Sequence, residues 1–190
     1  MEQRIEDIRP NDIVVDIGAA TGNFVAHAVA NNASHIVAVE PNQDYLRTLV
    51  ETTPNVTAIN AGIGSTANHF NNISSKGYKK MSFLDLVVDY NIPKIDYLKI
   101  DCEGGEYGIF TEMNFPYLRT KVKNIQVDFH LNSYSGCAKQ WQKLRDGLLK
   151  KFETVEFLNP DDEAKATDDN FLKAGDFSTL PYFTLLISNS

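Results

Sequence analysis

The sequence predicts an α/β fold built on a doubly wound, mostly parallel sheet with helices on both faces. Apolar runs of strand length alternate with segments of helical periodicity along most of the chain. The first run, residues 13–17, is apolar except at Asp16, which is typical of a parallel strand covered on both faces. Small residues from Gly18 to Gly22 then lead into a helix, the arrangement at which open α/β sheets bind nucleotide-like ligands.

Length, composition and charge narrow the class of protein. The chain has 190 residues of ordinary globular composition, and we expect one domain over residues 1–190 with a full hydrophobic core. Its net charge of -7 disfavours a nucleic-acid partner, because affinity for a phosphate backbone depends on clustered Lys and Arg. Lys76, Lys79 and Lys80 form only a short basic cluster, which we interpret as a solvated loop.

The cysteines and the hydropathy pattern bear on location. Cys102 and Cys137 form neither a disulfide framework nor a C-x-x-C pair, which favours a reduced setting. No apolar run reaches the ~20 residues of a membrane span, and no signal-peptide pattern precedes the first strand. We therefore expect a cytoplasmic protein without a membrane span, and the sequence leaves its oligomeric state open.

The turn after the first strand indicates which ligand binds. Dinucleotide sites favour G-x-G-x-x-G, which seats a diphosphate on the helix N-terminus, but Ala20 stands where the second glycine is expected. Asp16 lies at the carboxyl end of the strand, where a carboxylate repels phosphate and attracts an ammonium group. The pattern D-x-G-x-x-x-G, ending at Gly22, therefore favours S-adenosylmethionine, and it resembles the first motif of class I methyltransferases. Thr21 is expected to cap the following helix.

The second strand, His35–Val39, ends in the residues Glu40, Pro41 and Asn42. A carboxylate at the tip of this strand can accept hydrogen bonds from both ribose hydroxyls, and we predict this role for Glu40. Pro41 ends the strand, and Asn42 is placed to cap the next helix.

A third strand is expected over residues 55–59. The loop 60–64 follows it and contains Ala61 and Gly62, small residues that leave room for an adenine ring. Further elements are expected in this order: a short strand over residues 66–70, a polar, substrate-facing loop over 71–80, and a helix over 83–88 capped by Ser82.

Three carboxylates crowd the end of the next predicted strand, Ile95–Ile100. Asp101, Glu103 and Glu106 fall within six residues around a glycine turn. Like charges at such spacing raise one another's pKa, so the cluster indicates a cationic ligand or a role in proton transfer. If this strand lies beside the first one, Asp101 lines the same cleft as Gly18.

The remaining elements complete the predicted sheet. They are a helix over residues 107–113, a strand over 124–129 that ends at His130, a helix over 137–151, and strands over 152–158 and 182–187. Residues 159–179 are rich in acids without clear periodicity, and we predict a mobile loop. The full prediction is a Rossmann-like, doubly wound, mostly parallel seven-stranded sheet with an antiparallel C-terminal strand.

Beyond the first motif, the chain resembles the FkbM-type methyltransferases from residue 14 to about residue 131. The resemblance is carried by VVDIGAATGNF, AVEPN, AGIGS, SFLDLVV, YLKIDCEGGEYGIF and IQVDFHL. Its most specific part is K-I-D-x-E-G-x-E, which Lys99 to Glu106 matches. The resemblance implies an S-adenosylmethionine-dependent O-methyltransferase that acts on a hydroxyl of a sugar, a glycolipid or a natural product.

Methyl transfer depends on in-line positioning and on removal of the acceptor proton. His130, with a usual pKa near ~6.5, is the predicted base at neutral pH. Asp101 is the second candidate, expected to orient the acceptor or to face the methionine amine. Glu103 and Glu106 are equally interpreted as acceptors of backbone N–H bonds in the turn. The predicted cofactor-binding residues are Asp16, Gly18, Ala19, Gly22, Asn23, Glu40, Pro41, Asn42, Ala61, Gly62, Asp101 and Glu103.

Three alternatives stay open. Asp101, Asp128 and His130 offer ligands suited to Mg²⁺ or Mn²⁺, although the preferred interpretation assigns no metal. A nicotinamide-dependent oxidoreductase has the same fold, but it favours the glycine that Ala20 replaces. A non-catalytic binding module could keep the cofactor cleft and lack an acceptor base.

Overall fold

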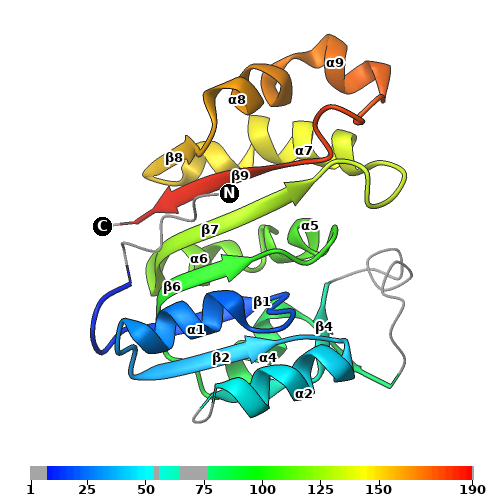
Figure 1. Ribbon diagram of the computed structural model, residues 1–190. Helices are drawn as coiled ribbons and strands as arrows, with labels where there is room; N and C mark the ends of the chain where they lie inside the picture. The colour runs from blue at the N-terminus through cyan, green and yellow to red at the C-terminus, as the bar shows by residue number, and fades with distance from the viewer. Residues whose placement is uncertain (1–7, 54–55, 65–76, 190) are drawn as a thin grey trace.

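A seven-stranded sheet forms the centre of the computed structural model, which describes residues 8–53, 56–64 and 77–189. Its strands lie in the order β3-β2-β1-β6-β7-β9-β8 (Figure 1). In that order they span Thr57–Ile59, His35–Val39, Ile13–Ile17, Ile95–Ile100, Val122–His130, Tyr182–Ser188 and Thr154–Phe157. The pairs from β3 to β7 are parallel, and β9 runs antiparallel to both of its neighbours. The predicted sheet, including its antiparallel C-terminal strand, is confirmed.

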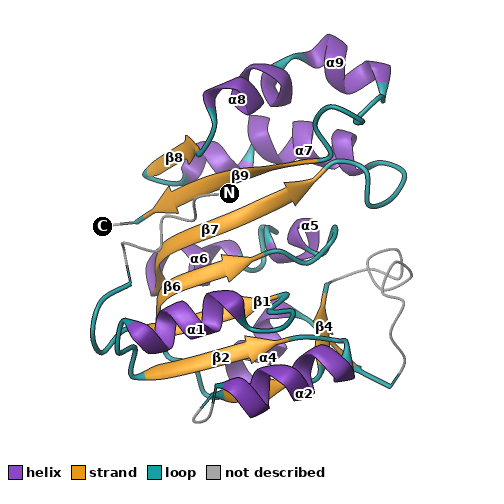
Figure 2. Cartoon of the chain, viewed as in Figure 1, coloured by secondary structure: helices purple, strands orange, loops and turns teal. Residues whose placement is uncertain are grey.

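Helices cover both faces of this sheet, as the continuous apolar strands predict (Figure 2). Val14 faces the side covered by α1 (Asn23–Ala30) and α2 (Gln43–Thr52), where it packs in one cluster with Phe24 and Leu49. Val15 and Ile17 face the opposite cluster. The helices that contribute to that cluster include α4 (Phe83–Asp89), α5 (Glu106–Ile109), α6 (Phe115–Lys121) and α7 (Cys137–Asp146). The alternation along one strand thus fixes which helix lies on which face.

Two helix caps are confirmed and one is wrong. The Asn42 side chain accepts hydrogen bonds from the first turn of α2, and Ser82 forms a capping box with Asp85 at α4. Thr21 does not cap α1, because the N-cap is Gly22 in the left-handed conformation without a side-chain bond. The turn therefore depends on glycine's backbone freedom rather than on a hydroxyl.

The predicted loop 60–64 is wrong, because it contains the strand β4 (Ala61–Ile63). This strand pairs in parallel with β5 (Lys79–Met81), whose first two residues lie in the segment predicted as a polar loop. Strands of three residues have too few alternating positions to leave a periodic pattern. The expected strand at 66–70 and the rest of the expected loop, up to residue 76, lie outside the described residues.

Two predicted helices are shorter than expected. The helix α5 ends at Ile109, where the amide of Asn114 donates to the carbonyls of Gly108 and Ile109 at 3.3 and 2.8 Å. This side chain satisfies carbonyls that a longer helix would use itself. Further along, α7 ends before Gly147, and the 3-10 helix Leu148–Lys151 completes the predicted span.

The acidic segment 159–179 is not an irregular loop. It contains α8 (Pro160–Thr167) and α9 (Asp169–Ala174), which follow side-chain caps at Asn159 and Asp168 (Figure 1). Ala166 is fully buried, and its carbonyl accepts a hydrogen bond of 2.8 Å from Trp141 Nε1. Each helix has too few buried positions for the periodicity to stand out from the charged residues.

The helices of the described part are short, and α2 and α7 each span 10 residues. None of the described helices combines the length and the apolar character that crossing a membrane requires. Cys102 and Cys137 are both free thiols.

At Gly18, directly after β1, the backbone lies so close to the end of β6 that there is no space for a side chain. Gly18 has φ of +88°, and a Cβ there would lie 1.8 Å from the Asp101 carbonyl oxygen. Gly175 has a similar φ of +74°, but a Cβ added to it would meet nothing within 4 Å, so it isolates the cost of the backbone conformation. We predict that Gly175→Ala lowers the free energy of unfolding by about 1 kcal/mol and Gly18→Ala by about 3 kcal/mol or more, measured by urea denaturation. Equal losses in the two variants would contradict this packing.

Candidate cofactor and acceptor site

A cavity of about 340 Å³ lies at the carboxyl ends of β1, β2 and β6. The strand order reverses between β1 and β6, and open α/β sheets bind ligands outside such a reversal. The cavity is lined by Ile17, Gly18, Ala20, Val39, Glu40, Pro41, Asn42, Tyr45, Ala61, Gly62, Ile63, Asp101, Cys102 and Glu103. The expectation that Asp101 and Gly18 share one cleft is therefore confirmed.

The predicted cofactor-binding residues divide into two sets. Those that line the cavity are Gly18, Glu40, Pro41, Asn42, Ala61, Gly62, Asp101 and Glu103. Those that do not line it are Asp16, Ala19, Gly22 and Asn23. Sequence reasoning missed Tyr45, which lies on the first turn of α2 and is 47% exposed. The position of this aromatic residue, a few residues after Glu40 and Pro41, was the sequence signal that could have placed it at the cavity.

Backbone strain marks both walls of the cavity. Ala20 has φ of 46° and Glu103 has φ of 53°, the left-handed conformation that side-chain-bearing residues rarely adopt. Both residues line the cavity, from the turn after β1 and from the turn after β6. Such strain persists where surrounding contacts enforce it, and it concentrates at functional sites.

Glu40 is held rigidly at the tip of β2. Its Oε2 accepts the Ala20 N–H at 2.9 Å, and its Oε1 accepts the Asn42 N–H at 2.7 Å. Burial raises the pKa of Glu40, and these two backbone donors oppose that shift. The Asn60 amide donates to the Glu40 and Pro41 carbonyls at 3.1 and 3.0 Å, a support that sequence reasoning missed. The carboxylate is thus fixed with oxygen lone pairs available to ribose hydroxyls.

Asp16 lies in the sheet as a buried acid rather than in the cavity wall. It is 1% exposed, and its Oδ1 has no hydrogen-bond partner among the described residues. Burial raises the pKa of Asp16 to about 7, although nearby Lys99 opposes the shift. The two residues are paired across β1 and β6, and Lys99 Nζ also lies 3.3 Å from Asp101 Oδ2. An unpartnered buried carboxylate oxygen fits a ligand that brings an ammonium group.

His130, at the carboxyl end of β7, is surrounded by acids. Its Nδ1 lies 2.9 Å from Glu106 Oε1, and its Nε2 lies 3.6 Å from Glu103 Oε2 and 3.8 Å from Asp101 Oδ1. Burial lowers the pKa of His130, but the three carboxylates outweigh it and raise the pKa to about 9. The expectation of a base with a pKa near ~6.5 is therefore wrong, because the fold brings the carboxylates of the 101–106 turn against a histidine that follows a different strand.

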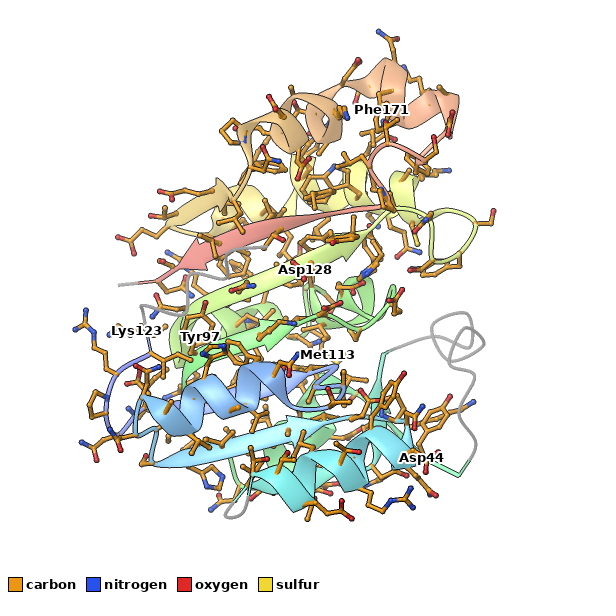
Figure 3. All side chains as sticks on the ribbon, viewed as in Figure 1. Asp44, Tyr97, Met113, Lys123, Asp128 and Phe171 are labelled. Carbon is orange, nitrogen blue, oxygen red and sulfur yellow. The ribbon has the colours of Figure 1, made fainter. Side chains whose placement is uncertain are left out.

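The predicted metal ligands are only partly brought together. One ligand atom each from Asp101, Glu103 and His130 lies within 4.8 Å of the others. Asp128 is engaged differently, since its carboxylate accepts a hydrogen bond from the Thr184 hydroxyl. Figure 3 shows Asp128 on β7, on the sheet face that β7 shares with Tyr97 and α1. The triad spacing suits a shared cation, and a proton on His130 Nε2 supplies a positive charge at this place.

Several other aromatic and titratable residues lie outside the lining of the cavity. Trp141 and Phe110 are buried in the core. His27 and His35 are exposed, and His69 lies outside the described residues. Glu106 accepts the Cys102 N–H at 3.0 Å, so the predicted turn-holding contact is confirmed for this acid.

The fold and this site belong to the class of Rossmann-like methyltransferases. The family model of FtsJ-like methyltransferases matches residues 1–177, and the chain belongs to this family. The match does not confirm the narrower FkbM-type resemblance, which stays a prediction. No curated protein matches the sequence.

Solved structures with the same fold act on different acceptors. An rRNA methylase from Streptococcus thermophilus has a TM-score of 0.56 at 13% identity, with 97% of this chain and 90% of that chain covered. Precorrin-6y C5,15-methyltransferase from Geobacter metallireducens has 0.53 at 14%, covering 98% and 85%. Aeropyrum pernix fibrillarin with natively bound S-adenosyl-L-methionine has 0.51 at 11%, covering 96% and 68%. These neighbours are consistent with S-adenosylmethionine as the cofactor, and the fold leaves the acceptor open.

Burial of Asp16 predicts a pH-dependent cost to stability. The raised folded-state pKa means that the unfolded chain loses this proton first, so the fold is destabilised as pH rises from 3.8 through about 7. We predict that ligand-free Asp16→Asn has a free energy of unfolding about 2 kcal/mol above wild type at pH 8, converging with it towards pH 4. Urea denaturation at both pH values measures this.

The control for this prediction is Asp44→Asn, which removes the same charge from a side chain that is 79% exposed. Its effect should stay within about 0.5 kcal/mol at either pH. An Asp16→Asn protein that is less stable than wild type at pH 8 would contradict the assignment.

Proposed function

We propose that the protein is an S-adenosylmethionine-dependent O-methyltransferase, acting on a hydroxyl of a sugar, a glycolipid or a natural product. Glu40 would hold the ribose, because its fixed carboxylate lines the cavity. The small residues Ala61 and Gly62 line the same cavity and leave room for the adenine. Asp16 does not line the cavity, so it would attract the ammonium group of the methionine end at a distance, through its charge rather than by contact.

His130 is the group that would remove the acceptor proton, and its geometry is the observation that carries the proposal. Glu106 occupies Nδ1, so Nε2 is the nitrogen beside Asp101 and Glu103, which both line the cavity. When bound, S-adenosylmethionine supplies a methyl group whose carbon–sulfur bond breaks, with its electron pair staying on sulfur, as the new carbon–oxygen bond forms. The hydroxyl proton goes to Nε2, and Asp101 orients the acceptor.

The raised pKa of His130 sets the conditions for this role. With a pKa of about 9, the imidazole is mostly protonated at neutral pH and cannot accept a proton. A positive sulfonium nearby favours the neutral imidazole, because like charges disfavour one another. The proposed base therefore becomes competent when the cofactor is bound or when the pH is alkaline.

A neutral hydroxyl acceptor suits the charge of the site. Asp101 and Glu103 line the cavity, and Glu106 and Asp128 are buried close to His130 and Lys99. This concentration of carboxylates repels a phosphate backbone, and the net charge of -7 acts in the same direction. The FkbM-type resemblance supports the same class of acceptor.

The proposed function is tested by methyl transfer from labelled S-adenosylmethionine to sugars, glycolipids, polyketides and RNA. Methylation of a hydroxyl on a neutral acceptor supports it, and methylation of RNA alone would overturn the acceptor class. Calorimetric titration with S-adenosylhomocysteine and with NAD separates a methyltransferase from an oxidoreductase. Binding of NAD without S-adenosylhomocysteine would overturn the proposal altogether.

Removal of the proposed base should reduce turnover more than cofactor binding. We predict that His130→Gln lowers kcat by about 10²-fold or more, because general base catalysis typically contributes that much. His130 does not line the cavity, so the affinity for S-adenosylhomocysteine should be nearly unchanged by calorimetry. His35→Gln, at the exposed start of β2, is the matched control and should keep wild-type turnover. Full activity of His130→Gln would remove the base assignment.

The pH dependence of the reaction should follow the deprotonation of His130. Below its pKa the Nε2 atom carries a proton, so kcat/KM for the acceptor should rise about tenfold per pH unit and then level off. At saturating cofactor the apparent pKa should lie below about 9, because the sulfonium charge favours the neutral imidazole. Initial rates between pH 6 and pH 10 measure the profile, and a flat profile would contradict the proposed base.

A further inference from the structure

Glu106 is the most deeply buried acid of the site. Its side chain is 0% exposed at the start of α5. One of its oxygens, Oε1, lies 2.9 Å from His130 Nδ1 and accepts the Cys102 N–H at 3.0 Å. The other, Oε2, is buried with no hydrogen-bond partner in the part of the chain that the structure describes.

A carboxylate in this position is costly unless it acts on a partner. Burial of an ionised group without compensation destabilises a fold strongly, and leaving one oxygen unpaired adds to that cost. A backbone N–H at one oxygen could equally be satisfied by the neutral amide of glutamine. The contact that favours a full negative charge is therefore the one with the imidazole of His130.

We propose that Glu106 is the positioning residue for proton removal: it keeps the hydrogen on His130 Nδ1, directs Nε2 towards the acceptor, and stabilises the imidazolium once the proton has moved. This inference rests on the proposed function, in which His130 is the base. It adds Glu106 to the residues with a proposed role in the reaction, although Glu106 does not line the cavity.

The geometry leaves the imidazole little freedom. The Tyr107 hydroxyl donates to the His130 carbonyl at 2.9 Å, which fixes the backbone at the end of β7. The ring of Tyr182, on β9, lies 5.5 Å from the His130 ring at an angle of 35°. With Glu106 bonded to Nδ1, the ring is restrained by its backbone, by a neighbouring ring and by one of its nitrogens.

The same oxygen of Glu106 links the base to the cofactor wall. Cys102, whose N–H it accepts, lies between Asp101 and Glu103 in the turn after β6, and all three line the cavity. A displacement of this turn would therefore reach His130 through a single shared atom. Positioning errors of about 1 Å can cost about 10²-fold in rate, so this link matters for catalysis.

Several other charged groups face His130, and Glu106 differs from each of them. Asp101 and Glu103 approach Nε2 at more than 3.5 Å, and their side chains are 38% and 75% exposed, so water screens them. Within β7, Asp128 contributes a charge whose carboxylate is engaged by Thr184, and Lys99 faces the acids from β6. From β9, the Tyr182 phenol is a further titratable neighbour. Glu106 alone among these carboxylates is fully buried and directly bonded to the ring.

The test is Glu106→Gln, which keeps the shape and an amide oxygen for the Cys102 N–H but removes the charge. We expect the pKa of His130, followed by NMR titration of its ring protons without substrate, to fall by about 1 or more. The pH profile of kcat should move to lower pH with it, and its alkaline plateau should drop about tenfold or more because the imidazolium is less stabilised. Glu103→Gln, at an exposed carboxylate, should move the pKa of His130 less.

The outcomes separate a positioning role from a structural one. A purely structural Glu106 would change thermal stability and leave both the pKa of His130 and the pH profile in place, which would overturn the proposal. A lowered pKa with an unmoved pH profile would overturn it too, while loss of activity in His130→Gln would show that the base assignment itself stands. Full activity in His130→Gln would instead remove the base assignment on which this inference rests.

A measurement on the wild-type chain covers the case in which Glu106→Gln does not fold. The nitrogen chemical shifts of His130 above its pKa report which ring nitrogen keeps the hydrogen. The proposal requires the hydrogen on Nδ1. A hydrogen on Nε2 in the neutral ring would overturn it, because that nitrogen could then accept no proton.

Discussion

The structure depends on a concentration of negative charge where three parallel strands end. Asp16, Asp101, Glu106 and Asp128 lie around two cationic side chains, which belong to Lys99 and His130. Like charges at this density are unfavourable, and burial removes the water that would screen them. The fold accommodates them with raised carboxyl pKa values at Asp16 and Asp128 and with raised pKa values at both cations. A ligand that brings further positive charge reduces the same repulsion. The electrostatics of the fold therefore favour a positively charged cofactor.

Lys99, Asp101 and Glu106 belong to one local segment, and the register of the sheet brings groups from β1 and β7 to it. Parallel pairing places Asp16 opposite Lys99, and Lys99 opposite Gln126 on the next strand. Away from their carboxyl ends, the same strands are apolar on both faces and are covered by helices. Burial of this apolar surface stabilises the fold. Only at the carboxyl ends do the strands open onto a cavity, and the acids are gathered at that place. The hydrophobic core thus offsets the cost of a charged site that could not support itself.

Features set by neighbouring residues in the sequence could be predicted, and features set by contacts between distant segments could not. Gly18, Glu40 and Asp101 were predictable because each directly follows a strand, and strand ends in a doubly wound sheet converge. The pKa of His130 was not predictable, because Glu106, the carboxylate that raises it most, is 24 residues away in the sequence. Glu106 reaches His130 only through the packing of α5 on β7. The helices within residues 159–179 were missed for a similar reason, since α8 is held by a contact between its buried Ala166 and the distant Trp141. Periodicity reports long elements well, and it reports neither three-residue strands nor contacts between distant segments.

The choice of methyl acceptor depends on the residues around the cavity and not on the fold. An rRNA methylase and a precorrin methyltransferase share this sheet with the chain at 13% and 14% identity, so their common architecture fixes a cofactor cleft without fixing what is methylated. In the proposed reaction of this chain, the acceptor hydroxyl meets the charge at the rim of the cavity. In this chain that charge is carried by the half-exposed Asp101 and the exposed Glu103, next to a histidine held from behind by a buried acid. If the acceptor is a hydroxyl, as proposed, a phosphate close to it would have to approach these carboxylates at short range, where screening by salt is weakest. An uncharged polyol meets no such repulsion, and its neighbouring hydroxyls can donate hydrogen bonds to the same oxygens.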